Sequence, residues 1–190
     1  MKKLMLMLGV AAMAVGVQAA SFAWTSAAAY GIATTELNSL VDGTTYNAAT
    51  SGTANRMSKQ SVTWAYTLIL TDAATSTSAT LSGTPVFSST GKISDTLSSD
   101  LVVAGKDLTY SLVFTGTYTD ANNVEWTLTS NTISDSWHVS DQGDIALTTA
   151  VPSQWTATGD VPEPTSGILM LVGLGALALR RRRAYSDAIR

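Results

Sequence analysis

The chain has 190 residues, with 11 basic and 14 acidic side chains and no cysteine. Without cysteine, the chain has no disulfides, no cysteine zinc site and no thiol chemistry. Residues 21–160 carry four basic and twelve acidic side chains, a net charge of −8. This balance argues against nucleic acid as a partner, because binding phosphates needs clustered Lys and Arg.

The first twenty residues have the three parts of a secretory signal peptide. Lys2 and Lys3 form a basic start, residues 4–17 are uncharged and apolar, and small residues follow. An uncleaved N-terminal anchor is the alternative, but the apolar segment is short for that role. We therefore expect signal peptidase to cut after Ala19 or Ala20, and the chain to be exported.

Residues 21–160 form the body of the protein, and their clearest pattern is that of β-strands. Apolar residues occupy every second position in 61–71 and 107–119, between residues that are mostly Thr and Ser. This period of two predicts strands with one buried face. Turn residues at 120–123, followed by further alternation in 124–129, predict a β-hairpin with the strand before them.

Weaker patterns complete the body. We expect further strands around residues 22–24, over 133–139 and from Gly143 onward. Residues 72–83 are a low-complexity mixture of Ser, Thr and Ala, which indicates an exposed loop. Gly116 interrupts the alternation of its strand and suggests a β-bulge there.

Several strands with one apolar face each, and no convincing helix, indicate an all-β body. Two sheets packed face to face are the simplest way to bury such faces. The predicted fold is an antiparallel, jelly-roll-like β-sandwich of seven to nine strands, with a small closed barrel as the alternative. The chain has no internal repeat of fixed period, which argues against a β-solenoid.

His138 is the one histidine of the chain, with Asp135 and Asp141 close in sequence. A Ser-His-acid site also needs a nucleophile held against the imidazole and an oxyanion hole. No G-x-S-x-G turn is present to supply them. We therefore expect His138 to be a solvent-facing strand residue, and we expect no catalytic residues: the chain is not predicted to be an enzyme.

Two acidic segments, residues 120–125 and 141–144, could offer oxygen ligands to calcium. Neither matches the D-x-[DN]-x-[DN]-G loop, since Val124 occupies the fifth position of the first. A hydrogen-bonded hairpin turn is the preferred interpretation, and no metal or cofactor is predicted.

The five tryptophans could be stacking platforms for sugars. Trp64 and Trp126 alternate in step with aliphatic residues, so we expect both in the core. Trp155 lies near the polar segment that leads to the C-terminal tail, and it is the better candidate for exposure.

The C-terminal tail has three consecutive parts: a Pro-Glu-Pro break, an uncharged apolar segment at 167–179 and four arginines. A helix over the apolar segment spans only about 20 Å, against about 30 Å for the hydrocarbon core of a bilayer, so it predicts a weak anchor. The arginines fix its cytoplasmic end. The predicted sorting residues are Pro162, Glu163, Pro164, Arg180, Arg181, Arg182 and Arg183.

This tail, residues 161–184, resembles the PEP-CTERM sorting signal of exported bacterial proteins. The resemblance implies that exosortase, a membrane-bound cysteine peptidase-like enzyme, processes the chain in a Gram-negative-type envelope associated with extracellular polysaccharide. We expect the apolar helix 167–179 to hold the chain transiently in the inner membrane, with residues 185–190 in the cytoplasm. Cleavage near the motif then delivers the body to the cell surface or the extracellular matrix.

The resemblance concerns sorting, and the function of the body is a separate question. The leading hypothesis is a structural or adhesive protein, and the alternative is a carbohydrate-binding module acting on exopolysaccharide. A glycoside hydrolase or lyase would need paired carboxylates in a cleft. Ice binding is suggested by T-x-T patterns such as residues 115–119, but without a fixed repeat these are better explained as the outer face of a strand.

Overall fold

The computed structural model describes residues 19–141, 145–159 and 170–174. Outside these ranges lie the Pro-Glu-Pro segment, the arginine cluster and residues 185–190. The predicted signal peptide also lies outside them, except for residues 19 and 20. The regular secondary structure of the described body is mostly β-strand, which confirms the all-β class. The ten strands are β1 (Ala20–Ala28), β2 (Thr45–Asn47), β3 (Thr63–Asp72), β4 (Ser78–Gly83), β5 (Lys92–Ser99), β6 (Asp107–Thr119), β7 (Glu125–Ser130), β8 (Ile133–His138), β9 (Ala146–Thr149) and β10 (Gln154–Gly159).

Within the described ranges, the helical segments are short. α1 (Thr34–Leu37) is a single turn, and η1 (Thr53–Asn55) and η2 (Met57–Lys59) are 3-10 turns. Residues 170–174 form a further helical stretch.

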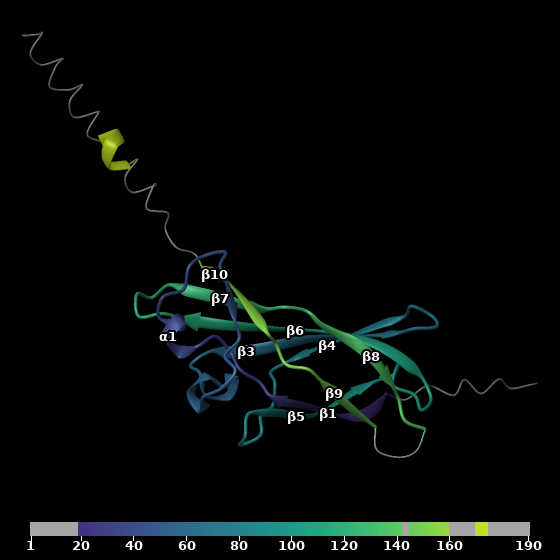
Figure 1. Ribbon diagram of the computed structural model, residues 1–190. Coiled ribbons are helices and arrows are strands. Elements are labelled where there is room, and N and C mark those ends of the chain that lie inside the picture. Colours follow the sequence, from purple (N-terminus) through teal and green to yellow (C-terminus); the bar gives the residue numbers. More distant parts are fainter. Residues whose placement is uncertain (1–18, 142–144, 160–169, 175–190) are drawn as a thin grey trace, which may run out of the picture. The chain divides into compact units, whose positions relative to one another are not determined.

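The strands form two sheets (Figure 1). β1 is the central strand of the smaller sheet, between β5 and β9, and the larger sheet has the order β2-β10-β7-β6-β3-β4, with β8 also paired to β6. β1 pairs with β9 in parallel, from Ala23 opposite Ala146 to Ser26 opposite Thr149. The expectation of a wholly antiparallel fold is therefore wrong at this pair. More than a hundred residues separate the two strands, so no hairpin dictates their direction.

The chain divides into two compact units, which are described separately. The first contains residues 1–29, 65–113 and 132–151, and the second contains residues 30–64, 114–131 and 152–190. Strands β3 and β6 contribute residues to both units.

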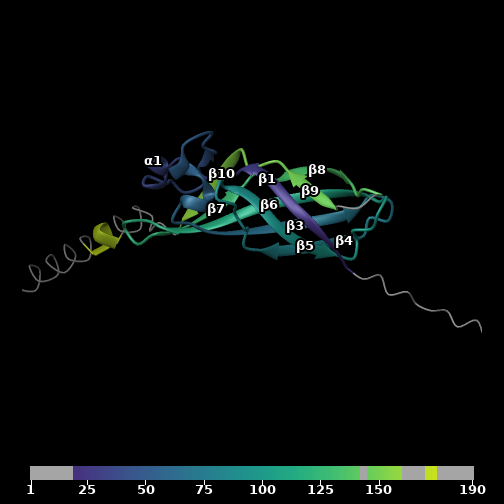
Figure 2. The same cartoon turned by 90° about the horizontal axis from the view of Figure 1, so that it is seen from below.

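The core of the first unit is built on the apolar side of β1, which is purple in Figure 1 and Figure 2. Phe22 and Trp24 are fully buried. The ring centroid of Phe22 lies 5.2 Å from that of Trp137 in β8, and that of Trp24 lies 4.7 Å from that of Tyr66 in β3. These contacts join strands of the two sheets within this unit. The jelly-roll-like sandwich as a whole stays a prediction.

The core of the second unit contains a pair of tryptophans. The ring centroids of Trp64 in β3 and Trp155 in β10 lie 4.9 Å apart. The indole N–H of Trp64 donates to the carbonyl of Met57, at 2.8 Å, and so satisfies the polar atom of a buried ring. Leu128 of β7 is also fully buried.

The hairpin predicted from the alternation is confirmed. β6 and β7 pair antiparallel, from Thr115 opposite Thr129 to Thr119 opposite Glu125. The register of this pair is unbroken through Gly116, which lies opposite Leu128, so the pairing with β7 contains no bulge at this residue. The missing side chain leaves room for the ring of Trp64 instead.

Four strands, β2, β4, β5 and β10, occupy segments that the sequence did not mark as strands. β4 lies in the low-complexity segment predicted as an exposed loop, and that prediction is wrong for residues 78–83. β4 pairs antiparallel with β3 from Tyr66 opposite Gly83 to Thr71 opposite Ser78, so a strongly patterned neighbour supplies its ladder. β5, β10 and β2 likewise lack an unbroken alternation of large apolar residues.

Candidate functional site

Outside the described residues lie the predicted sorting residues Pro162, Glu163 and Pro164 and the cluster Arg180–Arg183. Of the predicted apolar helix 167–179, the described part is residues 170–174, which are helical. Its large apolar side chains are all exposed, with Leu171 at 72%. No helix within the described ranges has the length and hydropathy needed to cross a bilayer.

His138 faces solvent, as predicted, but its acidic partner is not one of its neighbours in sequence. Nδ1 of His138 lies 2.7 Å from Oδ1 of Asp107, and both side chains are more than half exposed. The two residues are opposite each other in the pairing of β6 with β8. Hydrogen bonding to Asp107 raises the pKa of His138, and the charges of Asp107 and Asp141 act in the same direction. Asp135 instead accepts the backbone N–H of Ser136, at 2.8 Å.

This arrangement is an exposed ion pair at the end of two strands. The register of an antiparallel ladder brings together residues that are distant in sequence, and the sequence alone does not reveal that register. Among the described residues, the hydrogen bond of the His138 ring is to the carboxylate of Asp107 and not to a serine hydroxyl, so the pair carries no argument for nucleophilic catalysis.

Asp120 organises the turn between β6 and β7. Its Oδ1 accepts the backbone N–H groups of Asn122 and Val124, at 2.8 and 2.9 Å, and its Oδ2 accepts the indole N–H of Trp126, at 3.3 Å. The hydrogen bond from Val124 is the main cause of the lowered pKa of Asp120. Asn123 has a φ of 62°, as this tight turn requires.

The hydrogen-bonded hairpin turn predicted for residues 120–125 is therefore present in the structure. Throughout the described ranges, no three His, Asp or Glu side chains gather in a way that could hold a metal ion. Asp144, in the second acidic segment, lies outside those ranges.

All five tryptophans are buried, with exposed fractions from 0% to 8%. The prediction that Trp155 is exposed is wrong, because its ring is 0% exposed and its indole N–H donates to the carbonyl of Tyr30, at 3.3 Å. Trp155 lies in β10, where Ala157 shares its buried face. The tryptophans are thus core residues, and none of them offers a stacking platform to a sugar.

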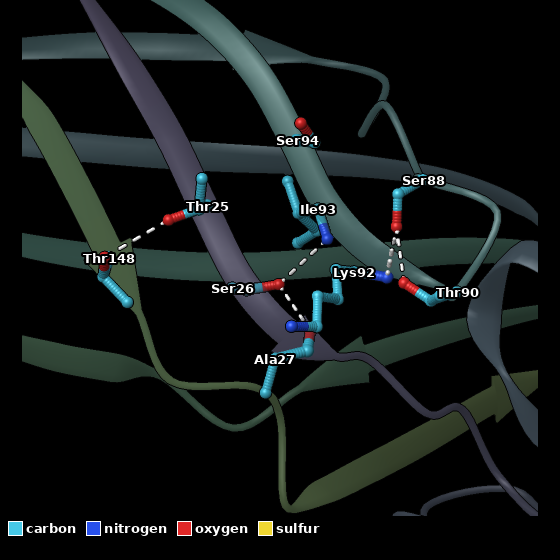
Figure 3. Close-up of a pocket in the computed structure, with 9 residues that line it drawn as sticks. All are labelled: Thr25, Ser26, Ala27, Ser88, Thr90, Lys92, Ile93, Ser94 and Thr148. Atoms are coloured by element: carbon cyan, nitrogen blue, oxygen red, sulfur yellow. Dashed lines mark hydrogen bonds between the residues drawn. The ribbon is translucent and has the colours of Figure 1, made fainter.

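A hollow lined by hydroxyl groups lies in the first unit, over β1, β5 and β9 (Figure 3). Its volume is about 630 Å³. The hydroxyls of Thr25 and Thr148 lie 3.2 Å apart, and those of Ser88 and Thr90 lie 2.9 Å apart. The hollow is lined by Thr25, Ser26, Ala27, Ser88, Thr90, Lys92, Ile93, Ser94 and Thr148.

Lys92 gives this hollow a single positive charge. Its side chain is exposed, and within the described residues it forms no ion pair. The loop from Ser88 is held close to it, because the hydroxyl of Ser88 accepts the backbone N–H of Lys92, at 3.2 Å. Hydroxyl groups around one cation suit a polyhydroxylated ligand that carries an anionic group.

The comparisons with known proteins identify the tail. A family model described as the PEP-CTERM protein-sorting motif matches residues 160–183. Searches of curated proteins and of solved structures returned no match. The resemblance of the tail is thereby confirmed, and the motif indicates an exported protein that exosortase sorts to the cell surface.

Proposed function

We propose that this chain is a structural or adhesive protein of the bacterial cell surface or extracellular matrix. The observation that carries the proposal is the PEP-CTERM motif at residues 160–183, attached to an all-β body. The motif accounts for export and sorting, and the all-β body is the part of the chain that is sorted to the surface. The finer steps belong to the same proposal: cleavage by signal peptidase, transient holding in the inner membrane by residues 167–179, and a sandwich fold for the body.

The outward sheet face of the second unit supports an adhesive role. Threonines on β6, β7 and β10 stand opposite one another in two rows, which are Thr115, Thr129 and Thr156, and Thr117, Thr127 and Thr158. All six side chains lie on the exposed or half-exposed side of their strands. These two rows of hydroxyl and methyl groups, with the carboxylate of Glu125 on the same side of β7, suit many weak contacts with a hydrated polymer, whose strengths add through multivalency.

The experiment compares cells that lack the chain with cells that make it or its variants. Loss of the chain is expected to reduce cell aggregation and attachment to a surface. The native chain and the His138→Ala variant should both restore them, because no catalysis is involved. A chain whose four arginines at 180–183 are replaced by serines should not restore them. Unchanged attachment without the chain, or failure of His138→Ala alone, would contradict the proposal.

Carbohydrate binding is the second candidate, and the hollow of Figure 3 favours it. Its hydroxyl lining and Lys92 suit a sugar that carries a carboxylate, as in an acidic exopolysaccharide. Calorimetric titration of the purified chain with an acidic and a neutral polysaccharide tests this. Lys92→Ala should weaken binding of the acidic polymer, whereas Lys59→Ala, an exposed lysine of the second unit, should not. Equal effects of the two changes would assign the binding to net charge and not to the hollow.

A further inference from the structure

The edges of the two sheets differ in how they are protected. An edge strand exposes a row of backbone N–H and C=O groups that a strand of another molecule can pair with. β2 and β9 have only three and four residues. β5 carries Lys92 and Asp95, and β8 carries Asp135 and His138. Short length and charged side chains both discourage pairing with another chain.

β4 has neither form of protection. Its six residues, Ser78–Gly83, include no charge and no proline, and the nearest charged residues in the chain are Asp72 and Lys92. One side of β4 pairs with β3, and β4 ends the strand order of the larger sheet. In the described part of the chain, no backbone group of residues 79–83 hydrogen-bonds outside the ladder with β3.

We propose that β4 is a self-association edge, which pairs antiparallel with β4 of a second copy of this chain. Pairing centred on Thr80 places residue 80 opposite itself, Ala79 opposite Leu81, and Ser78 opposite Ser82. Ala79 and Leu81 are on the half-buried side of the strand, and the other three residues are on its exposed side. In this register the half-buried face of one strand therefore continues the half-buried face of the other. The two exposed faces match in the same way, as a stable sheet requires.

The pairing extends the sheet of the first unit across a twofold axis. Ile69 of β3 is 37% exposed and lies opposite Thr80 in the β3–β4 ladder. A row across the dimer then runs Ile69, Thr80, Thr80 of the second copy and its Ile69, with an apolar side chain at each end. Because the twofold contact uses the same edge of both copies, it closes at a dimer and does not propagate into a fibre.

This inference deepens the proposed structural role, since it names a second copy of the chain as a partner. A single strand pair buries little surface, so the contact is weak in dilute solution. Sorting to a surface raises the local concentration of the chain, and weak contacts between neighbours then suffice. The biological role rests on the proposed function, but the pairing itself is tested on the purified full chain and fails or succeeds independently of sorting.

The first test is a disulfide trap. The chain has no cysteine, so a single introduced cysteine gives no background. Opposite residues of an antiparallel pair have Cβ atoms about 5 Å apart, which is close to the reach of a disulfide. Under mild oxidation, Thr80→Cys should form a covalent dimer much faster than Thr109→Cys, an exposed β6 residue that pairs inside the sheet with Ser136. Equal rates for the two variants would overturn the proposal.

The second test is sedimentation of the full chain over a concentration series. Thr80→Lys places two like charges directly opposite each other, so the dissociation constant of the dimer should rise by roughly tenfold or more. Thr109→Lys adds the same charge away from the edge and should leave self-association unchanged. A native chain that stays monomeric throughout, or a Thr80→Lys variant that associates like the native chain, would overturn the proposal. Circular dichroism verifies that each variant is folded. If Thr80→Lys does not fold, the disulfide trap decides whether β4 is the contact.

Discussion

The ring of Trp64 lies against the backbone of Gly116. A Cβ atom added at residue 116 would be 2.5 Å from Cζ3 of Trp64 and 2.7 Å from Cγ1 of Val62. Gly159 has the same relationship with Trp126, at 2.5 Å from Cε3. In the second unit, glycines on the buried side of strands thus make room for indole rings. The break in the alternation of β6 is a packing feature and not a change of register.

Gly116→Ala is expected to lower the free energy of unfolding by about 1–3 kcal/mol, because the added methyl group forces the Trp64 ring to move. Thr117→Ala, one residue further on the exposed side, should change it by less than about 0.5 kcal/mol. Urea denaturation followed by tryptophan fluorescence measures both. A Gly116→Ala variant as stable as the native chain would show that the ring has room to shift.

Asp72 and Lys106 form the shortest ion pair of the described residues, with Nζ of Lys106 2.6 Å from Oδ2 of Asp72. Oδ1 of Asp72 also accepts the backbone N–H of Ala74, at 2.9 Å. The hydrogen bond from Lys106 is the main cause that lowers the pKa of Asp72 from 3.8 to about 2. The pair holds the end of β3 beside the loop before β6, within the first unit.

The lowered pKa predicts how this pair affects stability at acid pH. The pKa is lower in the folded state, so the carboxylate stabilises the fold above pH 3.8, and this contribution is lost as the pH falls from about 3.8 to about 2. Asp72→Asn should destabilise the protein at neutral pH and flatten the acid side of its stability curve. Asp100→Asn, at an exposed carboxylate without an ion pair in the described residues, serves as the control. Parallel acid curves for the native chain and Asp72→Asn would contradict the assignment.

The sequence predicted the strands that combine large apolar residues with strict alternation. In β3, the residues Trp64, Leu68 and Leu70 are buried as their spacing indicated. The hairpin of β6 and β7 followed from the same pattern and the turn at Asp120. These features are local, since a period of two and a turn are written in consecutive residues.

The features that the sequence did not predict depend on partners distant in the chain. β4 is a strand because β3 lies beside it, and its own Ser, Ala and Gly residues have a weak preference for strands. Trp155 is buried because β10 pairs with β7 and packs its ring on Trp64. Asp107 meets His138 through the register of two strands. None of these pairings leaves a signal in consecutive residues.

The pair of His138 and Asp107 can be followed directly by NMR. The pKa of His138 is raised above 6.5, chiefly by the hydrogen bond to Asp107, so Asp107→Asn should bring it back towards that value. Because the folded pKa is raised, any stabilisation is present below pH 6.5 and lost as the pH rises through the folded pKa. Both side chains are largely exposed, so the effect on stability should be small. A titration unaffected by Asp107→Asn would show that the contact does not persist in solution.

The last prediction concerns the sorting of the tail. Arginines are retained on the cytoplasmic side of a membrane, so Arg180–Arg183 should hold the segment 167–179 long enough for a peptidase to act. Proline disfavours helix, so Pro162 and Pro164 should keep the neighbouring peptide bonds accessible to the cleft of a peptidase. Intact-mass measurement of the protein from its native envelope should therefore find a chain that ends near the Pro-Glu-Pro segment. Replacing the four arginines by serines should leave an unprocessed or secreted full-length chain, whereas serine at Arg190 alone should change nothing. A mature native chain that still ends at Arg190, in cells with active exosortase, would contradict the predicted processing. Normal processing of the four-serine variant would show that the arginines do not hold the tail.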